Sequence, residues 1–325
     1  MGKGRGRSLV AGRIGRALAA PVLAGLVAAS PSAKAQTDPM KLLNTPTPAG
    51  ERIAYGPGPL NFGELRVPMG RGPFPVVVLV HGGCWQAQLS EDAPAAMASF
   101  ELLRPAAEAL ARQGIATWNI EYPRVGDPGG GWPGSYRDIS RATDYLQRIA
   151  PSHHLDLNRV IVAGHSSGGQ LALWLAIRGK LPKTSAIYSR PAVQLKGVID
   201  IDGPPDLRTM WPLQQRMCNA PVLTQFLGGS PQEVPARYSE GAVTDFIPVG
   251  LPQTMLIRDH PPETTAIDRQ YAQAAQKAGD RVTVVMQQGP SHFDGLNPDA
   301  KDWATVIGSA RTMLGLPPEA AAARH

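Results

Sequence analysis

Short apolar runs rich in Val and Ile alternate with longer segments of helical period along this chain, and no other feature limits its fold as strongly. The runs predict strands at 63–67, 76–80, 116–119, 160–163, 197–201, 254–258 and 282–286. The segments between them predict helices at 105–113, 135–150, 169–178, 269–278 and 303–314. Strands that alternate with helices form a mostly parallel sheet with helices on both faces, so the sequence predicts an α/β domain.

One long stretch, 203–250, interrupts this alternation. It is dense in proline and carries large apolar residues such as Trp211 and Phe226. A structureless loop of this length is uncommon inside a compact domain. We therefore expect it to form a small inserted cap over the C-terminal edge of the sheet, where α/β proteins bind their ligands.

The first 35 residues have the pattern of a secretory signal peptide. Their apolar run, Ala17 to Ala29, is shorter than the ~20 residues that a membrane-spanning helix needs. Small residues then stand at the two positions that a signal peptidase reads, in Ala33-Lys34-Ala35. We expect cleavage before Gln36, a mature domain of residues 36–325, and a periplasmic or secreted protein without a stable membrane anchor.

Removing this segment changes the charge of the protein. The chain contains 32 Lys and Arg and 26 Asp and Glu, a formal net charge of +6. Six of the basic residues lie in the predicted signal peptide and no acidic residue does, so 26 of each sign remain in the mature domain. A domain without net charge does not favour nucleic acid or an acidic membrane as a partner.

Two neighbouring serines follow the strand predicted at 160–163. The residues Gly164-His165-Ser166-Ser167-Gly168 match the pattern G-x-S-x-G, in which glycines permit a sharp turn from a strand into a helix. Ser166 occupies the middle position and is the predicted nucleophile. Ser167 begins the helix, where its backbone N–H can bind a developing oxyanion.

A second motif, HGGCW at residues 81–85, directly follows the strand predicted at 76–80. Its glycines let the backbone approach a ligand closely, so the N–H groups of Gly83 and Cys84 are the predicted remaining donors of an oxyanion hole. We expect His81 to brace this loop rather than transfer protons. Trp85 is expected either to line the substrate pocket or to pack in the core.

These two motifs and their order resemble the α/β-hydrolase superfamily, in particular its esterase and arylformamidase-like branch with an HGGxW oxyanion loop. The resemblance covers nearly all of the mature chain. It implies an eight-stranded twisted sheet and a triad in the chain order serine, acid, histidine. The stretch GPSHF at 289–293 is similar to the loop that carries the general base of this family, which makes His292 the predicted base.

The triad acid is the point at which the sequence departs from this family. Members usually carry HGxxDxxVP after the strand that corresponds to 254–258, but this chain reads IRDHPPETTAID there. Asp259 is the preferred candidate because it lies nearest the expected turn. Glu263 is the alternative, with a longer side chain to reach across, and Asp268 is a weaker third candidate.

The remaining cysteines and histidines give no cofactor or metal prediction. His153 and His154 lack a third ligand at metal spacing, so we predict neither a metal nor a cofactor. The sequence leaves open whether its two cysteines, Cys84 and Cys218, form a disulfide.

Together these features predict an exported serine hydrolase, a carboxylesterase that cleaves small ester substrates through a Ser166–His292–Asp259 triad. An arylformamidase acting on an N-formylkynurenine-type amide is an alternative that the HGGxW loop permits, although export argues against it. An acetyl or feruloyl esterase acting on plant polysaccharide stays open as well. A catalytically silent hydrolase-like binding protein is the alternative from a different class, because the acid motif is altered. The oligomeric state is not predicted.

Overall fold

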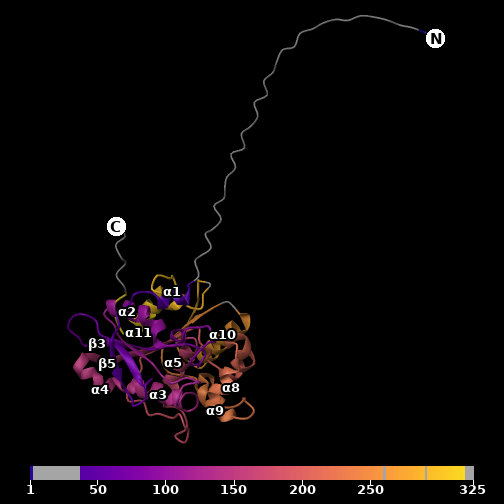
Figure 1. Ribbon diagram of the computed structural model, residues 1–325. Helices are drawn as coiled ribbons and strands as arrows, with labels where there is room; N and C mark the ends of the chain where they lie inside the picture. Colours follow the sequence, from indigo (N-terminus) through magenta and orange to yellow (C-terminus); the bar gives the residue numbers. More distant parts are fainter. Residues whose placement is uncertain (3–36, 259–260, 290, 319–325) are drawn as a thin grey trace, which may run out of the picture. The chain divides into compact units, whose positions relative to one another are not determined.

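The computed structural model describes residues 1–2, 37–258, 261–289 and 291–318 (Figure 1). The chain divides into two units, 1–34 and 35–325, and all that follows concerns the second. Apart from its first two residues, the predicted signal peptide lies outside the described residues. In the part of the chain that is described, no helix is long and apolar enough to cross a membrane.

An eight-stranded sheet forms the centre of this unit, in the order β1-β2-β4-β3-β5-β6-β7-β8. The strands are β1 (Glu51–Ala54), β2 (Phe62–Arg66), β3 (Phe74–Val80), β4 (Ala116–Ile120), β5 (Leu155–His165), β6 (Val198–Ile201), β7 (Gln253–Ile257) and β8 (Val282–Met286). β2 pairs antiparallel with both β1 and β4, and all other pairs are parallel. The predicted strands are therefore confirmed, and the additional strand β1 lies at the edge of the sheet.

Helices cover both faces of the sheet (Figure 1). Alternate residues of β3 point to opposite faces: Val76 and Val78 belong to one apolar core, and Val77 belongs to the other. The first core is shared with α3 (Gly134–Asp144), α4 (Leu146–His153), α5 (Ser167–Ile177) and α10 (Pro262–Lys277). The second is shared with α2 (Arg104–Arg112), α11 (Trp303–Met313) and the short α1 (Pro39–Leu43).

Two helices differ from their predicted bounds by more than two residues. The helix predicted at 135–150 is divided at Tyr145 into α3 and α4. Helix α10 begins at Pro262 and therefore includes a polar first turn, which the prediction from apolar periodicity left out. Short 3₁₀ turns complete the connections, at Ala95–Ala98, Phe100–Leu103 and Asp294–Leu296.

The segment predicted as an insertion consists of short helices. They are α6 (Leu207–Met210), α7 (Gln214–Cys218), α8 (Val222–Leu227) and α9 (Pro235–Gly241), with 3₁₀ turns at Trp211–Leu213 and Val243–Phe246. Leu223 and Phe226 are fully buried and anchor α8 in the first core. A disulfide between Cys218, at the end of α7, and Cys84, in the loop after β3, ties this segment to the sheet.

Candidate active site

Ser166 lies in a sharp turn between β5 and α5. Its backbone angles, φ 57° and ψ −125°, lie in a region that non-glycine residues adopt at a cost in energy. The flanking glycines make the turn possible, because a Cβ at Gly164 would lie 2.0 Å from the Gly168 carbonyl oxygen, and one at Gly168 would lie 2.2 Å from that of Val80. The half-buried Ser166 faces a cavity at the C-terminal edge of the sheet.

This cavity has a volume of about 370 Å³, within the range of small-molecule sites. Its wall brings together residues that the sequence predicted from separate motifs: Gly83, Cys84, Trp85, Ser166, Ser167 and His292. The inserted segment supplies apolar side chains to the same wall, among them Met210 and Met217. A nucleophile candidate, a base candidate and the proposed oxyanion loop therefore share one space.

His292 is held by a carboxylate that the sequence analysis did not consider. The Nδ1 atom of His292 lies 2.5 Å from Oδ2 of Asp202, the residue that directly follows β6. Burial would raise the pKa of Asp202, but the neighbouring His292 and Arg258 outweigh it and lower that pKa below its ordinary value. Asp202 is therefore an anion placed to fix the imidazole and to stabilise its protonated form.

Of the three acids predicted after β7, the structure describes two, Glu263 and Asp268. Asp259 lies outside the described residues, so its role stays a prediction. Glu263 lies in the first turn of α10, where its two oxygens pair with the Arg216 guanidinium at 3.0 and 2.9 Å. Asp268 is buried and lines the cavity, and burial together with the nearby Asp202 raises its pKa well above the ordinary value.

The sequence does contain an indication of Asp202, namely its place directly after a predicted strand, but no family motif includes this residue. The family resemblance predicts the acid after the strand at 254–258, which directly precedes the strand that leads to the histidine. Asp202 instead directly follows the strand predicted at 197–201, which pairs with the nucleophile strand. The C-terminal ends of parallel strands meet at one edge of the sheet, so this aspartate was a candidate on topology alone.

The histidine loop is fixed from two sides. His165 contacts one side, with its Nε2 2.9 Å from the His292 carbonyl oxygen. Burial lowers the pKa of His165 to about 3, so this ring is neutral. Within the described residues, no hydrogen bond joins the Ser166 hydroxyl directly to the His292 ring. Such contacts commonly tighten only when substrate is bound.

Thr37 holds the other side of this loop. Its carbonyl oxygen accepts a hydrogen bond from the Ser291 hydroxyl at 2.7 Å, and its hydroxyl accepts one from the Asn297 amide at 3.1 Å. The Thr37 amide and hydroxyl both donate to the buried carboxylate of Asp294. The start of the predicted mature chain is thereby joined to the residues on both sides of His292.

The loop after β3, the predicted oxyanion loop, has an unusual backbone conformation. Gly83, Cys84 and Trp85 have successive positive φ angles of 113°, 52° and 56°, which turn their peptide groups away from an extended course. A Cβ at Gly83 would lie 2.5 Å from the Cβ of Ala98, so glycine is required for space as well. The Cys84 side chain forms the disulfide, which excludes both a free packed thiol and a nucleophilic role for it.

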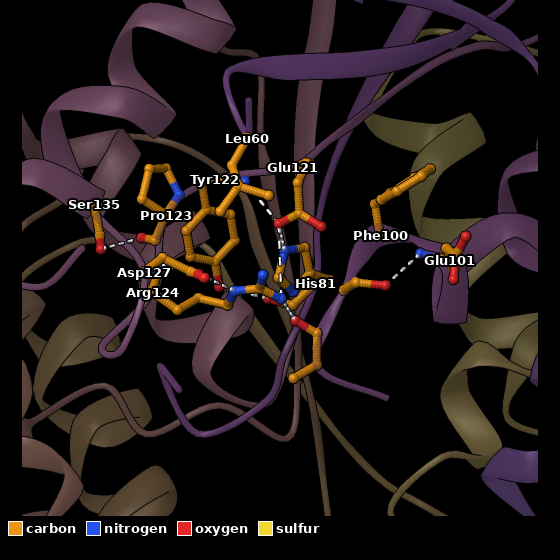
Figure 2. Close-up of polar contacts among 12 residues, drawn as sticks. Leu60, His81, Phe100, Glu101, Glu121, Tyr122, Pro123, Arg124, Asp127 and Ser135 are labelled. Atoms are coloured by element: carbon orange, nitrogen blue, oxygen red, sulfur yellow. Dashed lines mark hydrogen bonds and ion pairs between the residues drawn. The ribbon is translucent and has the colours of Figure 1, made fainter. Parts of the chain in front are cut away.

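Buried side chains hold the start of this loop in place through hydrogen bonds (Figure 2). The ring nitrogens of His81 lie 2.9 Å from Oε1 of Glu121 and 2.8 Å from the Gly82 carbonyl oxygen. Its ring stacks on Tyr122, whose hydroxyl donates to the His81 carbonyl oxygen at 2.9 Å (Figure 2). Burial would raise the pKa of Glu121, but His81 and Arg124 lower it. These contacts are those of a bracing residue, as expected of His81.

Trp85 combines the two roles that the sequence left open. It lines the cavity, yet it is 98% buried and packs beside Phe226 of the inserted segment. Its Nε1 donates to Oε1 of Gln170 on α5 at 3.2 Å.

His153, one of the two histidines considered as metal ligands, contacts Glu51 at 3.0 Å. No cluster of three potential metal ligands occurs among the residues that the structure describes.

A serine in a strand–turn–helix at the edge of an eight-stranded, mostly parallel sheet, with a His–Asp pair at the same cavity, defines the α/β-hydrolase class. The family model BD-FAE matches residues 65–273, and the chain belongs to this family. No curated protein matches it.

Solved structures share the fold at low sequence identity. Est2, an esterase from the Planctomycetes species Thermogutta terrifontis solved with propionate bound, is 21% identical, with a TM-score of 0.63 over 84% of this chain and 97% of that one. A bacterial heroin esterase is 20% identical, with a TM-score of 0.64 over 85% and 87% of the two chains. A bifunctional GH43-CE protein of Bacteroides eggerthii is 18% identical, with a TM-score of 0.65, and the match covers 82% of this chain but only 35% of that longer one.

Proposed function

We propose that this protein is a serine hydrolase of the carboxylesterase type, which cleaves small ester substrates through Ser166, His292 and Asp202. The observation that carries the proposal is the His292–Asp202 pair beside the strained Ser166 turn in one cavity. The family and the esterases among the structural neighbours support ester hydrolysis.

The reaction follows from the positions of these groups. Ser166 attacks the ester carbonyl while His292 accepts its proton, and the Asp202 anion stabilises the imidazolium that forms. The N–H groups of Gly83, Cys84 and Ser167 bind the oxyanion of the tetrahedral intermediate. His292 then gives the proton to the leaving alkoxide, and a water molecule releases the acyl group by the same steps in reverse. Asp202 replaces Asp259 in the role that the sequence analysis assigned to the latter.

We further propose that the protein acts outside the cytoplasm. The signal-like sequence of residues 1–35 and the Cys84–Cys218 disulfide both support export, because disulfides persist mainly in oxidising compartments. Detection of the mature protein in a periplasmic or culture fraction, with its first residue at Gln36, tests this directly.

A pair of serine variants tests the activity. Ser166→Ala should abolish hydrolysis of short 4-nitrophenyl esters, whereas Ser167→Ala should keep most of it, because Ser167 acts through its backbone. The opposite pattern would refute the assignment. Rates on N-formylkynurenine, measured beside those on simple esters, separate the arylformamidase alternative, since an arylformamidase should prefer the formamide.

A further inference from the structure

The Arg258 side chain stands at the cavity with part of its hydrogen-bonding capacity unused. It directly follows β7, its side chain is 19% exposed, and it lines the same cavity as Ser166. Its Nε donates to Oδ2 of Asp202. Neither of its terminal amino groups, Nη1 and Nη2, has a hydrogen-bond or ion-pair partner among the described residues.

The other charged groups around this cavity are already paired or neutral. Arg216 directs both of its terminal nitrogens at Glu263. Asp202 is shared between His292 and Arg258. Asp268 also lines the cavity; burial and the nearby Asp202 raise its pKa well above the ordinary value against the opposing effect of Arg258, so the fold favours its protonated form, which can donate a hydrogen bond. The neutral His165 adds no charge.

Apolar side chains form much of the remaining wall, including Leu89, Met97, Met210, Met217, Ile267 and Phe293. In a site of this kind a few polar groups fix the orientation of the ligand. Two parallel N–H donors on a planar guanidinium match the two oxygens of a carboxylate, and such charge-assisted pairs are among the stronger hydrogen bonds. The unused end of Arg258 therefore fits an anionic group on the substrate better than a neutral one.

We propose that the cavity accepts esters that carry a carboxylate in their acyl or alcohol part, and that Arg258 binds this carboxylate through its two terminal amino groups. The inference rests on the proposed function, since it names the substrate class of the same site. Arg258 thus has two contacts, one with Asp202 through Nε and one with the substrate through Nη1 and Nη2.

Two matched substrate pairs test the proposal, each consisting of an acid and its methyl ester. 4-Acetoxybenzoate and methyl 4-acetoxybenzoate carry the charge in the leaving group, and 4-nitrophenyl hydrogen adipate and 4-nitrophenyl methyl adipate carry it in the acyl chain. We expect kcat/KM to favour the acid by about tenfold or more in at least one pair, mainly through KM, as a charge-assisted hydrogen bond would give. Equal rates, or a preference for the methyl ester in both pairs, would overturn the proposal.

Variants separate substrate binding from an effect on the triad. Arg258→Gln should lower the rate on every ester, because Asp202 loses a neighbour, and should also bring the ratio of acid to methyl ester close to one. A fall by the same factor on both members of a pair would limit Arg258 to positioning Asp202 and would overturn the proposal. Arg208→Gln is the matched control, since Arg208 belongs to the inserted segment and pairs with Asp206 and Asp245, and it should leave the ratio unchanged.

A binding measurement distinguishes failure of this proposal from failure of the proposed function. Calorimetry with the Ser166→Ala protein compares 4-acetoxybenzoate with its methyl ester and requires no hydrolysis. Tighter binding of the acid, lost in Ser166→Ala/Arg258→Gln, supports the carboxylate site even if no ester is cleaved. Equal binding of the two compounds contradicts it even if the enzyme is an active esterase.

Discussion

Replacement of Asp202 by asparagine tests the altered position of the triad acid. Asparagine keeps the shape of the side chain but removes the charge that faces His292 Nδ1 at 2.5 Å. Two unit charges about 4 Å apart interact by ~4 kcal/mol at an effective dielectric constant of ~20, which corresponds to about 10³-fold in rate. Arg258 contacts the same oxygen and offsets part of this, so we expect kcat to fall between about 10²- and 10³-fold.

The assay is hydrolysis of a short 4-nitrophenyl ester with kcat and KM measured separately. KM should change little, because Asp202 acts on an imidazolium that exists only after the proton has moved. The melting temperature of the variant should be recorded as well, since Arg258 loses its anionic partner and the rate must refer to folded protein.

Two control variants complete the test. Asp259→Asn removes the acid predicted from the sequence and should leave kcat within a few-fold of its starting value. Asp268→Asn replaces a carboxyl whose pKa the fold raises well above its ordinary value, so asparagine resembles the favoured uncharged form and should have a similarly small effect. If Asp259→Asn removes the activity and Asp202→Asn does not, our account of the triad is wrong.

Three further predictions concern stability and the loops around the site. Burial, Asp268 and Asp202 raise the pKa of Asp200, so the folded protein favours its protonated form and loses stability as the pH rises. Asp200→Asn should therefore increase the free energy of unfolding at alkaline pH more than at pH 5. A pH-independent difference in urea titrations would contradict this. The Cys84→Ser/Cys218→Ser double variant removes a disulfide across a sequence separation of 134. Its free energy of unfolding in urea titrations should fall by ~2–5 kcal/mol, and its kcat should fall because the oxyanion loop is less well fixed. Unchanged stability and kcat would show that the disulfide does not fix this loop. Thr37→Val should lower kcat by about tenfold with little change in KM. Thr37→Ser should keep kcat near its starting value, because the serine keeps the hydroxyl that contacts Asp294. Equal kcat values in both variants would show that the hydroxyl does not position the histidine loop.

The elements that the sequence predicted are those in which burial dictates composition. Strands such as β3 and the second half of β5 are covered on both faces and therefore contain continuous apolar runs, Val76–Val80 in β3 and Val160–Ala163 in β5. Strand β1 lies at the exposed edge of the sheet and pairs only with β2, so its residues Glu51–Ala54 carry no apolar run that would reveal it. It was expected only because the family resemblance implied eight strands.

Local motifs identified the parts of the site that depend on local backbone shape. The Ser166 turn and the loop at Gly83 both require glycines at fixed positions, and those glycines are visible in the sequence. The partner of His292 depends instead on which strand ends lie side by side. The local pattern favoured Asp259, which lies outside the described residues, and did not include Asp202, whose carboxylate contacts the His292 ring.

Contacts between distant segments could not be predicted from the sequence either, because they also depend on which segments the fold brings together. Cys84 and Cys218 are brought together by the fold of the inserted segment, which no local pattern describes. Thr37 contacts Asp294 across a separation of 257 residues and has no feature that marks it before folding. Both contacts nevertheless hold loops on which the proposed chemistry depends.

The central claim, that Ser166 is a nucleophile activated by His292, is tested most directly by labelling the mature protein with a fluorophosphonate and mapping the adduct by peptide mass spectrometry. Our account predicts one stoichiometric adduct on Ser166, formed much more slowly in a His292→Ala variant. An adduct on Ser167, or a correctly folded protein that does not react at all, would contradict it.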